Sequence, residues 1–198
     1  MKHTLKLSIS AVALSFLAMA HSGNAQPSSM NSDFKLTSSS VKENQLLDQK
    51  FFWNNFGCTG GNVSPQLTWT KGPVETKSYA ITFYDKDAPT GSGFWHYQAY
   101  NIPANTTSIP EGALSEKKIP EGTVESNTDL GAPGYFGPCP PVGREHTYVY
   151  TVYALSTPVL NGADGKPANG KQTSALTGFF LWASKPLAKA SLSVKAKR

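Results

Sequence analysis

The stretch "SYAITFYDKDAPTGSGFWHYQAYNIP" (residues 78–103) decides the fold. Its two ends, 78–85 and 94–102, are rich in aromatic and β-branched residues that partly alternate with polar ones, which is typical of β-strands. Between them, the glycine-containing "PTGSG" (89–93) is a turn signal. The stretch therefore predicts a β-hairpin, which would place Asp85 and His96 on adjacent strand ends.

Other segments extend this pattern. We predict strands at 66–70 and 147–155 and a short final strand in "ASLSVKA" (190–196). Both alternating faces of 147–155 are apolar, which predicts a central strand that is covered on both sides. Because turns rich in Gly, Pro and Asn separate the strands, the chain favours a sheet sandwich over alternating strands and helices.

Two segments do not fit a strand pattern. The stretch "TSALTGFFLWASK" (173–185) predicts one helix, with an apolar face that we expect to hold Leu176, Phe179, Phe180 and Ala183. Residues 103–145 are rich in proline and glycine and predict a long loop. Loops of that length are often functional.

The chain begins with features of a secretory signal. Lys2 and Lys6 precede the apolar run "LSISAVALSFLAMA" (7–20), and small residues follow at 23–25. We predict a signal peptide over 1–25, which leaves 26–198 as a single domain. The alternative is an uncleaved anchor, but the run is short for a spanning helix, which needs about 20 apolar residues. The mature protein is therefore expected to be periplasmic or secreted.

The net charge bears on whether the protein binds nucleic acid, and the two cysteines bear on whether it contains a disulfide. The formal net charge of the chain is only +5, and no nucleic-acid-binding motif is present, so we expect no nucleic-acid partner. Exported proteins meet oxidising conditions, and two cysteines can form only one bridge. We therefore predict a Cys58–Cys139 disulfide; the alternative is two buried thiols.

The residues that could carry chemistry are few. Beyond residue 25 the only histidines are His96 and His146. The chain lacks the His-x-His, Glu-x-x-His and Cys-x-x-Cys spacings of metal sites and the Gly-x-Ser-x-Gly elbow of serine hydrolases. Asp85 and Asp87 are two positions apart, so they are hard to place on both sides of a glycosidic bond. We predict no metal, no cofactor and no catalytic residue.

Two readings of these polar residues stay open. In an anion pocket, a histidine donates hydrogen bonds to the ligand while an aspartate holds its ring in the donor tautomer. In a hydrolase, an Asp–His pair would act as a general base.

Four stretches together resemble one known family. They are "FGCTGGNVSPQLTW" (56–69), "YDKDAPTGSGFWHYQAYNIP" (84–103), "GYFGPCPPVGREHTYVYTVYAL" (134–155) and "SALTGFFL" (174–181). They resemble the phosphatidylethanolamine-binding protein family, in its bacterial Raf-kinase-inhibitor-like YbhB/YbcL branch. The similarity extends over roughly residues 33–195, with the motifs in the order and spacing of the family.

The resemblance implies a fold and a site. The fold is a mainly β sandwich with a large central antiparallel sheet, a smaller sheet and a C-terminal helix. The site is a small anion pocket at one end, which in the family accepts phosphate-type groups and phospholipid head groups. By motif position, the pocket residues here are Asp85, Asp87, Pro89, His96, Pro141, His146 and Tyr148, with Trp95 and Pro140 nearby.

Three details of the motifs carry expectations. The Ala88–Pro89 bond is expected to be cis, which would fix a tight turn. Lys86 stands in the middle of the usual Asp-Pro-Asp and is expected to face outward. Thr147 replaces the basic residue of the usual His-Arg-Tyr, which we expect to change a surface contact and not the pocket.

The function expected from the sequence is therefore an exported, non-enzymatic binding protein for a small anionic ligand, which could also modulate a partner protein through the same rim. The alternatives are an inhibitor-like protein that acts through the 103–145 loop and a hydrolase. We do not carry over kinase inhibition, because an exported protein does not meet a cytosolic kinase. A homodimer is compatible with the sequence but nothing in it demands one.

Overall fold

The computed structural model describes residues 33–198, so the predicted signal peptide and its cleavage site lie outside the described residues. The described part is mainly β and contains two antiparallel sheets and one α-helix. The elements are β1 (Leu36–Thr37), the 3-10 helix η1 (Gln49–Phe51), β2 (Leu67–Trp69), β3 (Ser78–Asp85), β4 (Phe94–Pro103), β5 (Ser108–Ile109), β6 (Val124–Glu125), β7 (Glu145–Leu155), α1 (Ser174–Ala183) and β8 (Ala188–Lys197).

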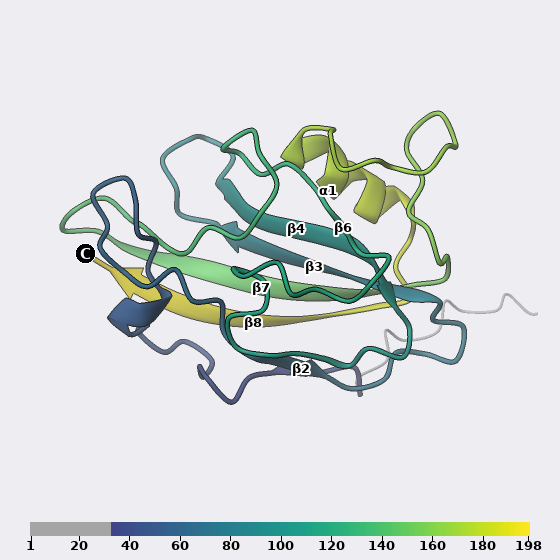
Figure 1. Cartoon of the computed structure of the whole chain (residues 1–198), viewed down its shortest axis with the longest axis horizontal. Coiled ribbons are helices and arrows are strands. Elements are labelled where there is room, and N and C mark those ends of the chain that lie inside the picture. The colour runs from purple at the N-terminus through teal and green to yellow at the C-terminus, as the bar shows by residue number, and fades with distance from the viewer. Residues whose placement is uncertain (1–32) are drawn as a thin grey trace, which may run out of the picture.

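The predicted sandwich is confirmed. The larger sheet has the strand order β6-β4-β3-β7-β8, and the smaller has the order β1-β2-β5. The large sheet lies between α1 on one side and the small sheet, which contains β2, on the other (Figure 1). The predicted hairpin is β3 and β4, and the predicted central strand is β7, which pairs with both β3 and β8.

Apolar side chains are buried on both faces of the large sheet. Between the two sheets, Phe83 of β3 stacks on Tyr150 of β7 with ring centroids 4.0 Å apart. Under α1, a smaller cluster joins Tyr100 of β4 to Phe180 and Leu181 of the helix. Burial on both faces explains why these strands show aromatic runs where a half-exposed strand would alternate with polar residues.

The helix begins as predicted but packs through a different face. The Thr173 side chain caps it by accepting a hydrogen bond from the Leu176 backbone N–H, at 3.3 Å. Its buried residues are Ser174, Thr177, Phe180 and Leu181, whereas Leu176, Phe179 and Ala183 are exposed. The expected apolar face is therefore wrong except at Phe180.

A buried polar contact explains the difference. The hydroxyls of Thr177 and Ser126 are 2.6 Å apart and buried, so the helix turns its small polar side chains toward the loop that follows β6. The spacing of apolar residues along the helix does not predict such a contact with a distant polar residue.

Two other regions contain more β-strand than the sequence predicted. The 103–145 region contains β5, which joins the small sheet, and β6, which joins the large one. The final strand, β8, is ten residues long and pairs with β7 from Glu145 to Ala154. These elements depend on partners that are distant in the sequence.

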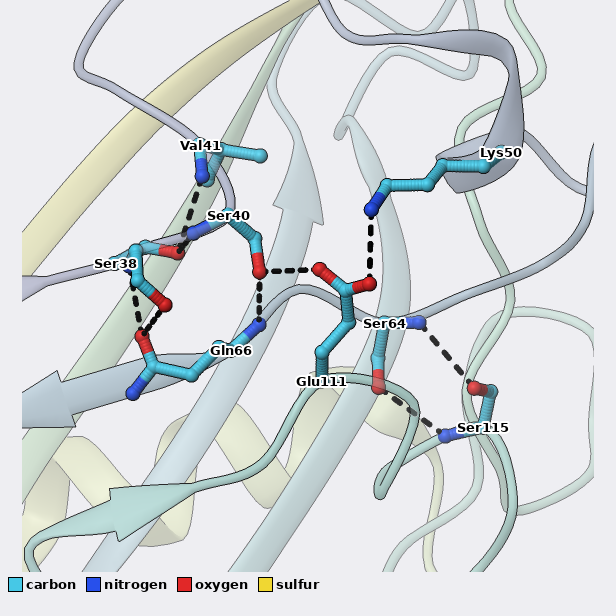
Figure 2. A network of polar contacts seen from close by, with 9 residues as sticks. Ser38, Ser40, Val41, Lys50, Ser64, Gln66, Glu111 and Ser115 are labelled. Carbon is cyan, nitrogen blue, oxygen red and sulfur yellow. Dashed lines mark hydrogen bonds and ion pairs between the residues drawn. The ribbon is translucent and has the colours of Figure 1, made fainter.

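Polar contacts attach the small-sheet side to η1 (Figure 2). The Glu111 carboxylate accepts hydrogen bonds from the Lys50 ammonium, at 2.8 Å, and from the Ser40 hydroxyl. Nearby, the Ser64 hydroxyl accepts from the Leu114 backbone N–H at 3.1 Å. The Lys50–Glu111 ion pair links η1 to this side of the molecule, and the chain runs from η1 directly into the residues that reach the cavity at the end of the large sheet.

Candidate functional site

A cavity of about 370 Å³ opens at the end of the large sheet where β3 ends and β4 and β7 begin. Its walls are mostly apolar, with a few polar groups from the ends of these strands. The lining residues are Trp53, Phe56, Asp85, Ala88, Pro89, Thr90, Phe94, His96, Leu130, Cys139, Pro141 and His146. A mostly apolar hollow of this size with a few convergent polar groups is typical of small-molecule sites.

Strand register brings Asp85 and His146 together. Asp85 pairs with Tyr148 across β3 and β7, so the residue two positions before Tyr148, His146, lies on the same face of the sheet. The Asp85 Oδ2 atom is 2.8 Å from His146 Nδ1, and both side chains are buried. Because a carboxylate only accepts, Nδ1 carries the hydrogen and Nε2 is left for other contacts.

Strand register also places His96 on that same face, because Asp85 pairs with Phe94 of β4 and His96 lies two positions after Phe94. Across β3 and β4, Phe83 pairs with Tyr97 and Tyr84 pairs with Trp95, so His96 is an extra residue without a partner. As a result, His96 and Tyr97 both reach the face that carries Phe83, and the two rings lie close to Phe83 and Tyr135. In a regular strand, the neighbouring side chains of His96 and Tyr97 would point to opposite faces.

The His96 ring is held by a backbone carbonyl. Its Nδ1 atom lies 2.9 Å from the Phe136 oxygen, which can only accept, so Nδ1 carries the hydrogen here too. Burial lowers the pKa of His96 to about 4, against smaller opposing effects of the Phe136 carbonyl and of the Asp85 and Asp129 charges. At neutral pH the ring is uncharged, and its Nε2 is an acceptor.

Asp87 stands beside the cavity and not in its wall. Its carboxylate accepts a hydrogen bond from the Thr147 backbone N–H at 2.7 Å and pairs with Lys86 at 3.2 Å. Burial raises the pKa of Asp87, but the Thr147 and Lys86 hydrogen bonds outweigh it and lower the pKa below its usual value. Asp87 borders an adjoining hollow with Arg144. Lys86 is half exposed, as expected for an outward-facing side chain.

The expectation of a cis Ala88–Pro89 bond is wrong, because no peptide bond in residues 33–198 is cis. The turn is formed by other means. Asp85 Oδ1 accepts a hydrogen bond from the Asp87 backbone N–H at 2.9 Å, and Gly91 and Gly93 take positive φ angles. Pro89 still lines the cavity.

Tyr148 lies behind the two histidines. Its ring is fully buried, with centroids 5.3 Å from the His96 ring and 6.4 Å from the His146 ring. Its hydroxyl is buried and has no hydrogen-bond partner within residues 33–198, although Asp85 and the Cys139 backbone lie near enough to affect its pKa. Burial, and then the Asp85 charge, raises the pKa of this hydroxyl.

Two of the expected neighbours are also outside the cavity wall. Trp95 points to the other face of β4. There its ring packs on the Tyr84 ring, with the centroids 4.5 Å apart, and lies against Gly178 of α1. Pro140 is buried, and the next residue, Pro141, lines the cavity. Of the nine residues expected at the site, Asp85, Pro89, His96, Pro141 and His146 meet in the cavity.

One wall of the cavity consists of residues that were not predicted from the sequence. Trp53 and Phe56 line the cavity, with their rings stacked at a centroid distance of 5.0 Å. They are held there by the predicted disulfide between Cys58 and Cys139, which is present, and Cys139 itself lies in the wall. The position of the cysteines could have drawn attention to these aromatic residues, because a bridge between the two segments brings 53–58 to the pocket motif.

Residues 33–198 contain neither a candidate metal-binding cluster nor a candidate membrane-spanning helix. No group of three or more His, Cys, Asp or Glu side chains within 33–198 is arranged to hold a metal ion. Over the same range, no helix has both the length and the apolarity to cross a membrane.

A β-sandwich with a cavity bounded by Asp and His at the end of its large sheet defines a class of small-ligand-binding fold. The family model of the phosphatidylethanolamine-binding proteins matches residues 37–196, and the chain belongs to this family. The predicted resemblance is thus confirmed.

Individual relatives agree with this assignment. The UPF0098 protein YbcL of Escherichia coli K12 is 42% identical over 155 residues, which are 77% of this chain and 81% of that protein. The UPF0098 protein YbhB of the same organism is 40% identical over 146 residues, which are 73% of this chain and 89% of that protein. The crystal structure of E. coli YbcL, described as a new member of the mammalian PEBP family, superposes with a TM-score of 0.77 at 39% identity, covering 84% of this chain and 99% of that one.

Proposed function

We propose that this protein is an exported, non-catalytic binding protein that holds a phosphate-type anion, free or as a phospholipid head group, in the cavity at the end of the large sheet. The observation that carries the proposal is the pair of buried histidines, His96 and His146. Each has its Nδ1 engaged by a protein acceptor, which leaves both Nε2 atoms for a ligand in the same cavity. The name of the family also supports a phospholipid-type ligand.

The composition of the wall supports binding without turnover. Thr90 is the one hydroxyl residue among the described lining residues, and its hydroxyl donates to the Gly93 carbonyl. Cys139 is in the disulfide and cannot act as a thiolate nucleophile. The polar groups that remain in the lining, Asp85 and the two histidines, are suited to orienting a ligand.

A hydrolase is the second candidate, because Asp85 and His146 form the close pair that a general base requires. Turnover of phosphomonoesters and phosphodiesters would support it if the turnover were lost in His146→Gln. No turnover across such a panel, with binding retained, would favour the non-catalytic proposal.

Export rests on the N-terminal sequence and on the disulfide, which is expected in an oxidising compartment. A Mycobacterium tuberculosis relative named putative lipoprotein LppC, 36% identical over half of this chain, is consistent with it. Mass spectrometry of the protein from fractionated cells tests the proposal. A mature N-terminus at residue 26 in the periplasm or medium is expected, and an intact Met1 in the cytoplasm would contradict it.

A partner protein could contact the rim of the cavity, where Phe56 and Val142 are exposed. We include modulation of such a partner in the proposal. Capture experiments with the wild type and with Phe56→Ser test it: a partner that binds both equally does not use this rim. Sedimentation of the mature protein with the same variant tests a homodimer through the rim.

The binding test uses the two histidines as reporters, since they are the only ones in the predicted mature chain. The mature protein is titrated with inorganic phosphate and with glycerophosphoethanolamine at pH 6, and the ring proton signals are followed by NMR. Saturable shifts of both rings are expected, and a weaker response in His96→Gln.

The matched control is Val74→Gln. Val74 is almost completely exposed and precedes β3, at the end of the sheet opposite Asp85, so this variant should respond as the wild type does. Unchanged ring signals with both ligands in the wild type would contradict the proposed function.

A further inference from the structure

None of the described residues that line the cavity carries a fixed positive charge. Of the described residues that line it, only Asp85, His96 and His146 ionise, and none is Lys or Arg. Anion sites in proteins usually include an Arg or Lys, because a permanent cation offsets the cost of burying the anion. The Arg198 guanidinium lies behind the wall, where it contacts Phe56 and Cys139, so among the lining residues themselves a positive charge has to come from the imidazoles.

The hydrogen bonds of both rings have a consequence for such a ligand. Nδ1 of His96 donates to the Phe136 carbonyl, and Nδ1 of His146 donates to the Asp85 carboxylate. In the neutral ring, the hydrogen on Nδ1 leaves Nε2 with a lone pair and no hydrogen. An oxyanion oxygen also presents lone pairs, so it finds no donor on a neutral ring held in this way.

We propose that the cavity binds an oxyanion together with a proton taken from solvent, which bonds to Nε2 of His96. This inference rests on the proposed function and specifies its chemistry. The proton adds to the Nε2 lone pair, the ring becomes an imidazolium, and the new N–H donates to a ligand oxygen. No bond of the ligand breaks.

His96 is the histidine that takes up this proton, because its ring is hydrogen-bonded to a carbonyl and not to a carboxylate. Its Nδ1 partner is a neutral carbonyl, whereas His146 has the Asp85 carboxylate at 2.8 Å. The charged or titratable groups around His96 are Asp85 of β3, His146 and Tyr148 of β7, and Asp129 of the loop after β6. The two acids favour the proton, while burial of the ring opposes it and keeps the unliganded ring neutral at neutral pH.

The charge balance also selects a class of ligand. With one proton taken up on His96 and a carboxylate on Asp85, the charges of these two groups cancel. A singly charged oxyanion, such as a phosphodiester, then adds one buried negative charge, whereas a dianion adds two. The cavity is therefore suited to the phosphodiester of a phospholipid head group better than to a phosphate dianion.

The test measures binding and proton uptake together. Glycerophosphoethanolamine and dimethyl phosphate are titrated by calorimetry into the mature protein from pH 5.5 to pH 8, because a phosphodiester stays singly charged over this range. Each titration is repeated in two buffers with different ionisation enthalpies, which reports the number of protons taken up. Uptake of one proton per ligand at pH 7 is expected, with affinity rising up to tenfold for each unit of pH lowered.

Two variants locate the proton. In His96→Gln the side-chain amide can donate without being protonated, so weaker pH dependence and a loss of about one proton of uptake are expected. Val74→Gln, at the opposite end of β3, should keep the wild-type slope. Equal proton uptake in His96→Gln and in the wild type would overturn the assignment to His96.

The possible outcomes separate this inference from the function on which it rests. Binding that is independent of pH and buffer in the wild type would overturn the inference and leave the binding function standing. Glycerophosphoethanolamine affinity that falls on acidification would also overturn it, because the ammonium end would then be donating to the neutral rings. No binding of either ligand at any pH would overturn the proposed function and the inference with it.

Discussion

Replacing both cysteines, as Cys58→Ala with Cys139→Ala, is expected to lower the free energy of unfolding by about 4 kcal/mol. The bridge joins residues separated by 81 positions. In the loop-closure model, a cross-link across that length removes chain entropy from the unfolded state worth about 4.5 kcal/mol at 25 °C. The measured loss should fall somewhat below this figure, because real unfolded chains are more compact than the model assumes.

The bridge also has local contacts in the folded protein. The Arg198 guanidinium donates to the Phe56 carbonyl at 3.3 Å and lies 3.1 Å from Cys58 Sγ, so the end of β8 is attached beside the cavity. Removing the bridge therefore frees the wall that carries Phe56, and ligand binding should weaken together with stability.

The assay is urea unfolding of the mature protein, followed by tryptophan fluorescence. With a slope of about 2 kcal/mol per molar urea, the midpoint of the double variant should lie about 2 M below that of the wild type. Wild type treated with dithiothreitol should shift by the same amount, and the double variant should not respond to the reductant. A loss below about 1 kcal/mol would refute the entropic reasoning, because it would mean that the bridge restricts the unfolded chain very little.

Three further predictions concern stability. The pKa of His96 is about 6.5 in the unfolded chain and about 4 in the folded protein. The free energy of unfolding is therefore unaffected by this group above pH 6.5 and falls by about 3 kcal/mol as the pH is lowered from 6.5 to 4. In urea unfolding at a series of pH values, His96→Gln should lose that part of the pH dependence. Phe83→Ala should cost about 3–5 kcal/mol in the same assay, because the ring is fully buried against Tyr150; a loss as small as that of Phe83→Leu would contradict this. Gly137→Ala should lower Tm by several degrees, since the new Cβ would lie 2.3 Å from the Phe51 carbonyl oxygen. An unchanged Tm would show that the backbones of residues 137 and 51 are not this close.

The local sequence was sufficient to predict several elements. The strand predicted over 78–85 is β3, with the same bounds, and the helix begins after its predicted Thr173 start. Turn residues and apolar runs act within a few positions of the chain, so a single segment contains the signal for each of these elements. The disulfide could be predicted because there were only two cysteines to join.

Other features depended on residues far away in the chain. The length of β8 follows from its pairing with β7, and the polar face of α1 follows from the Ser126 hydroxyl across the interface. Trp53 and Phe56 reach the cavity through the disulfide. Neither the neighbours of these segments in the sequence nor their composition contains that information.

The candidate site shows the same division. The sequence by itself determined that Asp85 and His96 would flank a hairpin and that His146 would open a central strand. Only the tertiary structure decided that all three side chains meet, because Asp85 pairs with Phe94 of β4 and with Tyr148 of β7. His96 and His146 each lie two positions from one of these partners, so both share the face that carries Asp85. A strand alternates its side chains with a period of two, so a shift of one residue would turn them to the other face, and the register is set by pairing with the neighbouring strand.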